Sequence, residues 1–427
     1  MDENLPPKLE NEAEGRDSSV VEVGQEEDSK VEIEGGIALD GAGKAPGLRS
    51  LRELIDKATG RDRWLPTDLP DAGLADALPF PFLALVGQKE MKLALLLAIV
   101  NPAVSGALLV GPRGTGKTTA VRSIVDLLPM TSRSLCYYGC MPEDIETGGT
   151  DAVCPDCAKK YGQGEPLAKL DRVRLVELPL NARLEDVVGA VDERAVLHER
   201  MRVRRGILAQ ADRNLLYVDE VNLLPDDVVD AILDAAAMGA YTVRRGPVAA
   251  TYRARFALIG SMNPEEGRLR PQIMDRFGLR VVVRGLEDKE ERLEAYRRVY
   301  AYQQSPRRVT HAYMPDIEQA REEIQLVRDI LSDVVLPDDV AQEGLQMVHK
   351  LGIDSLRAEI TLFEAARAYA ALDGRLEVRT EDVFEVAPMA LRLRRSQFME
   401  EFFTRQDGEE QELTGLISEG RQKQSRP

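Results

Sequence analysis

The sequence predicts an α/β domain whose parallel β-sheet has helices on both faces, followed by an all-α domain. Short apolar, β-rich runs alternate with helical stretches, and they are continuously apolar, which is typical of strands covered on both faces. A glycine-rich loop follows the first run directly, and helical patterns dominate from about residue 288 onward. The apolar runs are Ala107–Val110, Val173–Leu178, Leu215–Val218, Phe256–Gly260 and Arg280–Val283.

Composition and pattern divide the 427 residues into successive segments. Residues 1–46 are acidic and poor in aromatic side chains, so we expect them to be disordered. Residues 47–81 hold a short amphipathic helix, expected to pack on its own domain rather than on a partner, and a connector containing prolines. The remaining segments are the α/β domain at 82–287 with a four-cysteine insertion at 136–157, the helical domain at 288–401 and a polar tail at 402–427.

Two patterns support the helical domain. Leu356, Ile360 and Phe363 share one face of a predicted helix. Thr380 is predicted to cap another helix, because two acidic residues follow it in the first turn.

Charge and hydropathy exclude several classes of protein. The net charge of −17 disfavours indiscriminate binding to nucleic acid. The longest clean apolar stretch, Leu93–Val100, is far shorter than the roughly 20 residues that span a bilayer. The acidic amino terminus resembles neither a secretory signal nor a transit peptide. We therefore expect a cytoplasmic protein without a membrane span.

The loop Gly111-Pro-Arg-Gly-Thr-Gly-Lys-Thr118 has the pattern of a phosphate-binding loop. Its glycines allow backbone N–H groups to approach phosphates, Lys117 reaches the β- and γ-phosphates, and the Thr118 hydroxyl is placed to bind Mg²⁺. The sequence therefore predicts binding of ATP and Mg²⁺. The expected nucleotide-binding residues are Gly111, Gly114, Thr115, Gly116, Lys117, Thr118, Thr119 and Asp219.

Polar side chains also follow two later strands. Asp219 and Glu220 come after an apolar run, where ligands bind in open α/β sheets. We expect Asp219 to help hold the Mg²⁺ and Glu220 to act as the general base that activates water. Asn263 follows the next apolar run and is predicted to orient that water, although an Asn preceding Pro264 also suits a simple turn.

Two arginines are candidates for stabilising the charge of phosphoryl transfer. Arg276 lies just after a predicted helix, where it can project into a neighbouring subunit, and Arg357 starts a helix of the all-α domain. Either arginine alone is more often a surface ion-pair former.

These motifs together resemble the AAA+ ATPases, and in particular the I subunits of magnesium chelatase. The resemblance implies that the helical domain is a lid, that Asn263 is the first sensor, Arg276 an arginine finger acting in trans and Arg357 the second sensor. It also implies a homo-oligomeric ring, typically hexameric, a helix-containing insertion at 182–206 and a β-hairpin at 241–253. The strings that carry it are Leu85-Val-Gly-Gln88, Leu215–Leu224, Leu233–Ala237, Met262–Gly267 and Leu269–Gly278.

The family also implies partners and a client. An ATP-driven ring would power Mg²⁺ insertion into protoporphyrin IX, held by a separate large subunit, together with an AAA-like partner that carries an adhesion domain. Such a reaction belongs to chlorophyll or bacteriochlorophyll biosynthesis. This chain has no Asp-x-Ser-x-Ser run of its own, and its acidic extension and Arg268 depart from the family pattern.

Other clients stay open. Related ATPases serve cobalt insertion or remodel proteins through adhesion-domain partners. A DNA-remodelling ATPase is a weaker alternative, because clustered arginines in a ring channel can contact phosphates. Those arginines are Arg200, Arg202, Arg204, Arg205, Arg244 and Arg245.

The cysteines have the spacing of a metal site. Cys136-x3-Cys140 and Cys154-Pro-Asp-Cys157 form two pairs that are typical of a four-thiolate structural zinc site. Free or redox-responsive thiols and an iron–sulfur cluster are the alternatives. His198, His311 and His349 show no ligand spacing with one another, so ordinary roles are expected for them.

Overall fold

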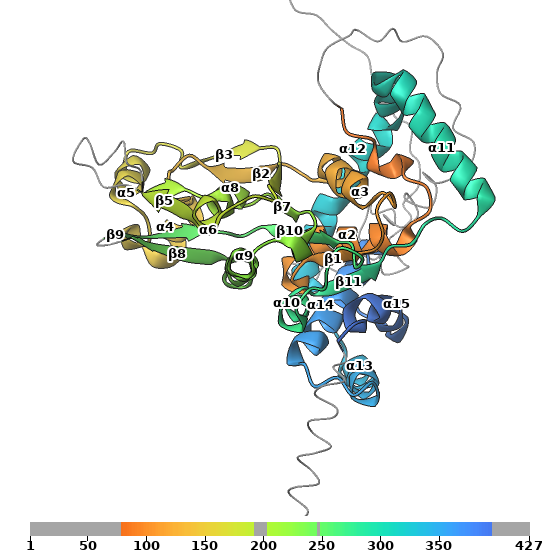
Figure 1. Ribbon diagram of the computed structural model, residues 1–427. Helices are drawn as coiled ribbons and strands as arrows, with labels where there is room; N and C mark the ends of the chain where they lie inside the picture. Colours follow the sequence, from red (N-terminus) through yellow and green to blue (C-terminus); the bar gives the residue numbers. More distant parts are fainter. Residues whose placement is uncertain (1–77, 192–202, 246–247, 395–427) are drawn as a thin grey trace, which may run out of the picture. The chain divides into compact units, whose positions relative to one another are not determined.

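The computed structural model describes residues 78–191, 203–245 and 248–394, and these belong to one compact unit (Figure 1). The acidic extension, the short amphipathic helix predicted at residues 48–58, most of the connector and the polar tail lie outside the described residues. Within the described part, no helix combines the length and the apolar character needed to cross a bilayer. The proposed division at residues 287 and 288 stays a prediction.

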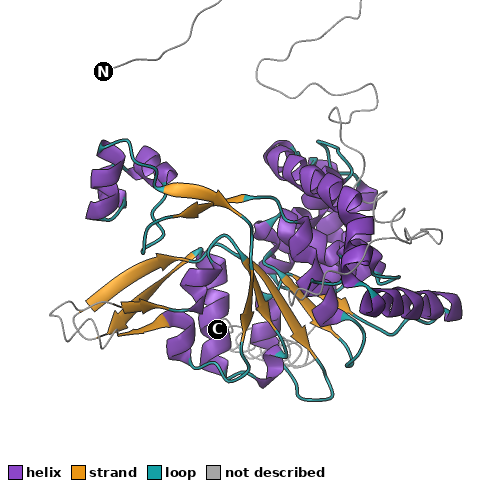
Figure 2. Cartoon of the chain, turned by 90° about the horizontal axis from the view of Figure 1, so that it is seen from above, coloured by secondary structure: helices purple, strands orange, loops and turns teal. Residues whose placement is uncertain are grey.

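The central sheet has five parallel strands, as predicted. Their order is β11 (Leu279–Val282), β1 (Ala107–Val110), β10 (Ala257–Met262), β7 (Leu215–Val218) and β4 (Leu175–Leu178). Strands that are neighbours in the sheet are not consecutive in the chain, so each pair requires a crossover connection. These connections place helices against the faces of the sheet (Figure 2).

Helices cover both faces of this sheet, because successive strand residues point to opposite sides. Leu109 and Tyr217 join an apolar cluster with helices α2, α3, α12, α14 and α15. Leu108 and Val218 join a second cluster with α6, α8, α9 and α10. These helices are α2 (Lys89–Val100), α3 (Lys117–Ile124), α6 (Leu184–Val188), α8 (Ile207–Ala211), α9 (Asp226–Met238), α10 (Pro271–Arg276), α12 (Pro306–Ile330), α14 (Leu356–Leu372) and α15 (Thr380–Leu391).

The part after the sheet is helical, as expected. Leu356, Ile360 and Phe363 all lie on α14, as predicted, but one detail of the prediction, the cap at Thr380, is wrong. Leu356 and Ile360 are 69% and 50% exposed, because α14 turns its alanine-rich side, including Ala358 and Ala365, into the core. Thr380 is the first helical residue rather than the cap, and Asp382 instead accepts a hydrogen bond from the Arg379 N–H at 2.8 Å. The other helices here are α11 (Lys289–Gln304) and α13 (Asp338–Lys350).

Three small two-stranded sheets are added to the central one. The first, β2 (Thr131–Ser134) with β3 (Ala168–Asp171), encloses the cysteine segment and its helices α4 (Pro142–Gly148) and α5 (Pro155–Gly162). The other two occupy the predicted insertion and hairpin: β5 (Gly189–Val191) with β6 (Val203–Arg205), and β8 (Ala240–Arg245) with β9 (Val248–Arg253). Single 3₁₀ turns lie at Phe82–Ala84, Pro102–Val104, Val125–Leu127, Thr150–Ala152, Val221–Leu223 and Leu331–Asp333.

Candidate functional site

The phosphate loop connects β1 to α3 in a conformation that its glycines make possible. Gly114 and Gly116 have φ values of 77° and 84°, in the left-handed region that side chains disfavour. A Cβ at Gly111 would lie 2.1 Å from the Val283 carbonyl oxygen, so no larger residue fits there. The helix begins at Lys117, so the exposed Thr119 lies in its first turn.

The Lys117 ammonium is folded back onto the loop. Its Nζ donates to the carbonyl oxygens of Gly111 at 2.7 Å and Pro112 at 2.8 Å, and Thr115 Oγ1 also donates to Pro112. Burial lowers the pKa of Lys117, an effect that three nearby carboxylates oppose. Both of these partners are neutral carbonyls, so a phosphate at the loop would be a better partner for this buried cation.

Thr118 and Asp219 come together from α3 and the end of β7. Thr118 Oγ1 lies 3.4 Å from Asp219 Oδ2. Magnesium is bound by oxygen ligands in an octahedron whose adjacent oxygens are about 2.9 Å apart, so a small closing movement would let both oxygens bind one Mg²⁺. The donor set therefore fits the ion that the sequence predicts.

Two hydroxyl groups that the sequence analysis missed hold Asp219. The buried Tyr217 hydroxyl donates to Asp219 Oδ1 at 2.7 Å and lies 3.2 Å from Thr118 Oγ1, and its burial raises its pKa. Ser261 Oγ also donates to Asp219 and accepts from the Glu220 N–H at 3.2 Å. Tyr217 lies within an apolar run and Ser261 directly after one, and their only signal was a hydroxyl near the carboxyl end of a strand.

Glu220 has a backbone conformation that is uncommon for its residue type. Its φ of 48° and ψ of 52° are left-handed, a region where non-glycine residues store strain, often at functional sites. The hydrogen bond from its N–H to Ser261 holds this conformation in place. The carboxylate is about a quarter exposed and lies 3.5 Å from Arg113 Nη2.

Asn263 lies at the same edge of the sheet, at the end of β10, and is 4% exposed. Its Nδ2 donates to Glu266 Oε1 at 2.9 Å, and its Oδ1 accepts from the Glu265 N–H at 3.3 Å. The second contact is that of a turn residue, so Asn263 both shapes the turn and faces the site. Glu266 and Arg113 were also missed, although both lie inside quoted motifs.

Each of the two candidate arginines pairs with a carboxylate of its own chain. Arg276, at the end of α10, pairs with Asp234 of α9 at 2.7 Å and with Asp230 at 3.6 Å. Arg357 Nη1 lies 3.6 Å from the carboxylate of Asp275, the residue before Arg276. Asp275 also pairs with Arg280 and Arg394, both almost fully buried.

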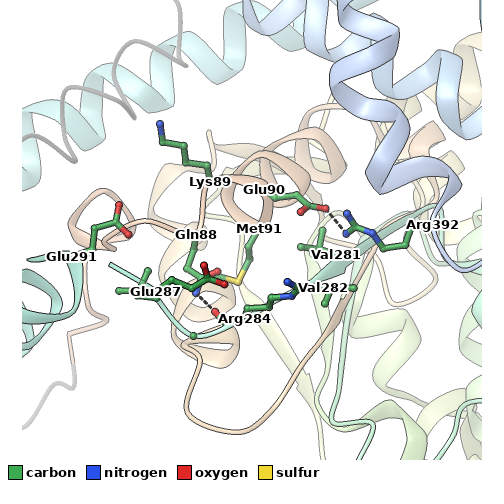
Figure 3. A pocket seen from close by; sticks show the side chains of 12 residues that line it. Gln88, Lys89, Glu90, Met91, Val281, Val282, Arg284, Glu287, Glu291 and Arg392 are labelled. Carbon is green, nitrogen blue, oxygen red and sulfur yellow. Dashed lines mark hydrogen bonds and ion pairs between the residues drawn. The ribbon is translucent and has the colours of Figure 1, made fainter. Parts of the chain in front are cut away.

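A pocket of about 620 Å³ lies beside the phosphate loop, between the start of α2 and the end of β11 (Figure 3). Gln88 Nε2 donates to the Arg284 carbonyl oxygen at 2.6 Å across it, and Glu90 pairs with Arg392 at 2.5 Å. Val282, which lines the pocket, pairs with Val110, the last residue before the loop, so the pocket lies close to the start of the loop.

All four cysteine sulfurs lie within 4.8 Å of one another, and those of Cys136 and Cys154 are 3.5 Å apart. Tetrahedral zinc–thiolate bonds place sulfurs about 3.8 Å apart, so the cluster fits zinc. The N–H groups of Tyr138 and Cys154 donate to the sulfurs of Cys136 and Cys140.

Hydrogen bonds and burial shift the pKa values of the cysteines in different directions. A bond from Cys140 lowers the pKa of Cys136 to about 4, and donating it raises the pKa of Cys140. Burial raises the pKa of Cys157 to about 12. His311 and His349 are exposed and outside the cluster, and His198 lies outside the described residues.

One arginine of the proposed nucleic-acid surface is committed to internal packing. Arg205 lies over the Tyr137 ring, 4.9 Å from its centroid, and donates to the Cys136 carbonyl oxygen at 3.0 Å. Arg244 is exposed on the β8–β9 hairpin. Arg200 and Arg202, and the side chains of Arg204 and Arg245, lie outside the described residues.

Known protein families match two parts of the chain. The family described as "Magnesium chelatase, subunit ChlI" matches residues 186–275, and "AAA lid domain" matches residues 348–414.

Similar proteins occur in archaea, bacteria and plants. A magnesium-chelatase subunit ChlI homolog of Methanocaldococcus jannaschii is 41% identical over 75% of this chain and 87% of its own length. The magnesium-chelatase 38 kDa subunit of Acidiphilium rubrum is 42% identical over 74% of this chain and 90% of its own length. A solved structure titled as a complex of the magnesium chelatase subunits BchI and BchD matches with 38% identity and a TM-score of 0.43, covering 76% of this chain and 99% of that chain.

Proposed function

The chain belongs to the magnesium chelatase ChlI family of AAA+ ATPases, and on that premise we propose that it drives Mg²⁺ insertion into protoporphyrin IX held by a separate subunit. The observation that carries the proposal is the meeting of Thr118, Asp219, Glu220 and Asn263 at one edge of the sheet, beside the phosphate loop.

Within this site the residues have separate roles. Lys117 and the loop N–H groups bind the phosphates, and Thr118 and Asp219 hold Mg²⁺, which would neutralise phosphate charge. Glu220 accepts a proton from the attacking water, and Asn263 orients that water. The pocket between α2 and β11 takes the nucleoside, because it opens next to the loop.

The site is completed by a neighbouring subunit in a ring, which we propose to be a hexamer. The contacts of Arg276 with α9 and of Arg357 with Asp275 support a shared surface that faces the neighbour's triphosphate. Arg276 is the arginine finger, and Arg357 acts beside it rather than on the nucleotide of its own chain.

The partners are a large porphyrin-binding subunit and an AAA-like subunit with an adhesion domain. A cobalt-chelatase or protein-remodelling client would use the same ATP site with other partners. A DNA client is less well supported, because Arg205 is engaged with Tyr137. A cytoplasmic location stays a prediction.

Reconstitution with both partner subunits, protoporphyrin IX, Mg²⁺ and ATP tests the function. We expect Mg²⁺ insertion, followed by porphyrin fluorescence, to require this chain and to be abolished in Lys117→Ala, because that variant loses its phosphate contact. Lys350→Ala, an exposed lysine on α13, is the control and should retain activity.

Two results would contradict the proposal. Insertion that persists in Lys117→Ala would remove this chain from the energy-coupling step. ATPase activity stimulated by single-stranded DNA, with no response to the partner subunits, would favour the DNA-remodelling alternative.

We also propose that Cys136, Cys140, Cys154 and Cys157 hold a structural zinc ion. Support comes from the sulfur separations and from the buried position of Cys140 and Cys157 around Ile145 and Leu167. Four thiolates fill a tetrahedral shell, which leaves no ligand position for substrate.

Protein purified under reducing conditions without chelator should contain about one zinc per chain. Cys157→Ser should lose most of this metal and make residues 131–171 more sensitive to protease, because the apolar cluster around the cysteines is small and would lose the bonds that the metal supplies. Lys160→Ala, exposed on α5, should keep its zinc. Metal analysis that finds no zinc in the unmodified protein would refute this site.

A further inference from the structure

Arg113, the third residue of the phosphate loop, bridges two carboxylates. Its Nε lies 2.5 Å from Glu266 Oε1, and its Nη2 lies 3.5 Å from Glu220 Oε1. The two acids come from different strand ends, because Glu220 follows β7 and Glu266 follows β10. A single cation on the loop therefore holds the proposed general base and a second acid together.

Glu266 extends this link to Asn263. Its Oε1 accepts both the Asn263 amide at 2.9 Å and the Arg113 guanidinium, and these two bonds lower its pKa. Its Oε2 is buried, with no hydrogen-bond partner among the described residues. Arg113 is thus connected, directly or through Glu266, to both residues proposed to handle the attacking water.

The Arg113 guanidinium is exposed enough to exchange its carboxylate partners for another anion. Its side chain is 73% exposed, and it belongs to the loop that binds the phosphates. The attacking water lies beyond the terminal phosphate, so a side chain that reaches Glu220 and Glu266 lies on the γ-phosphate side of the loop. A γ-phosphate brings a concentrated negative charge there and competes with both carboxylates for Arg113.

We propose that Arg113 senses the γ-phosphate within its own chain. Without nucleotide it is bound to Glu266 and Glu220. When ATP binds, it transfers to the terminal phosphate and leaves Glu220 and the Asn263–Glu266 pair free to position water. ADP has no γ-phosphate, so Arg113 stays bound to Glu266 and Glu220 when ADP is present. This inference rests on the proposed ATPase function and adds to it a residue that contacts the γ-phosphate.

The test compares the dissociation constants of Mg²⁺–ADP and of a non-hydrolysable Mg²⁺–ATP analogue, measured by displacement of a fluorescent nucleotide. Arg113→Ala should weaken binding of the ATP analogue about tenfold, because a charged contact is lost, and should leave ADP binding within about twofold. A merely structural role would weaken both nucleotides equally.

The opposite change is expected from the partner residue. Glu266→Gln keeps an oxygen to accept the Asn263 bond but removes the ion pair that competes for Arg113. Binding of the ATP analogue should therefore tighten by roughly two- to fivefold, with ADP binding unchanged. In Arg113→Ala the same Glu266→Gln change should have no effect on the ATP analogue, since the competing cation is absent. Arg113→Lys should restore part of the lost affinity.

Equal shifts for the two nucleotides, or unchanged binding of the ATP analogue in Arg113→Ala, would overturn the inference while leaving the ATPase proposal intact. Lys117→Ala separates the two ideas, because it should weaken binding of both nucleotides. An unmodified chain that bound neither nucleotide would overturn the proposed function and this inference with it.

Discussion

Replacing Arg276 with alanine should lower kcat for ATP hydrolysis by about 10³-fold or more, the range measured for arginine fingers. The guanidinium stabilises charge that spreads over the phosphoryl oxygens in the transition state, so its loss should affect turnover much more than ADP affinity. Steady-state ATPase assays and ADP titrations measure the two quantities. Arg292→Ala, an exposed arginine on α11, should behave as the unmodified chain.

A mixing experiment shows whether Arg276 acts in trans. Lys117→Ala and Arg276→Ala chains should each be inactive, but rings assembled from both should regain part of the activity. In such a ring, an intact Lys117 on one subunit can meet an intact Arg276 on its neighbour. If mixing restored nothing although mixed rings formed, Arg276 would have to serve the site of its own chain.

Glu220→Gln should lower kcat by about 10²- to 10⁴-fold, the usual contribution of a general base, while ATP binding persists. The amide has nearly the same shape, but it cannot take a proton from water. The Glu220 N–H bond to Ser261 is a backbone contact, so the substitution should leave the local conformation unchanged.

Single-turnover hydrolysis and nucleotide binding, measured on the same preparation, separate chemistry from affinity for this variant. Glu265→Gln is the matched control, because Glu265 is exposed and lies at the same edge of the sheet. Full activity in Glu220→Gln would assign the general base to another group.

The strands and the phosphate loop were predictable because their signals are local. An apolar run of four residues, such as Ala107–Val110, followed by glycines that adopt positive φ, specifies strand and turn without reference to distant residues. Parallel strands also end at one edge of their sheet. The proximity of Asp219, Glu220 and Asn263 therefore followed from their positions after β7 and β10.

Other features depended on packing between segments far apart in the chain. Leu356 and Ile360 have helical spacing, yet they are exposed, because α14 packs through small residues that allow its neighbours a close approach. Tyr217 was read as part of an apolar strand, and only the fold places its hydroxyl against Asp219 and Thr118.

The sequence by itself determined where the strands lie along the chain, the phosphate loop, the acidic pair and the cysteine spacing. Each of these features depends on neighbours within a few residues. Only the tertiary structure decided that Arg357 meets Asp275 and that Arg113 joins Glu220 to Glu266. The physical reason is that a long charged side chain can pair with a residue far away in the sequence. Spacing along the chain does not show which opposite charge the fold brings within its reach.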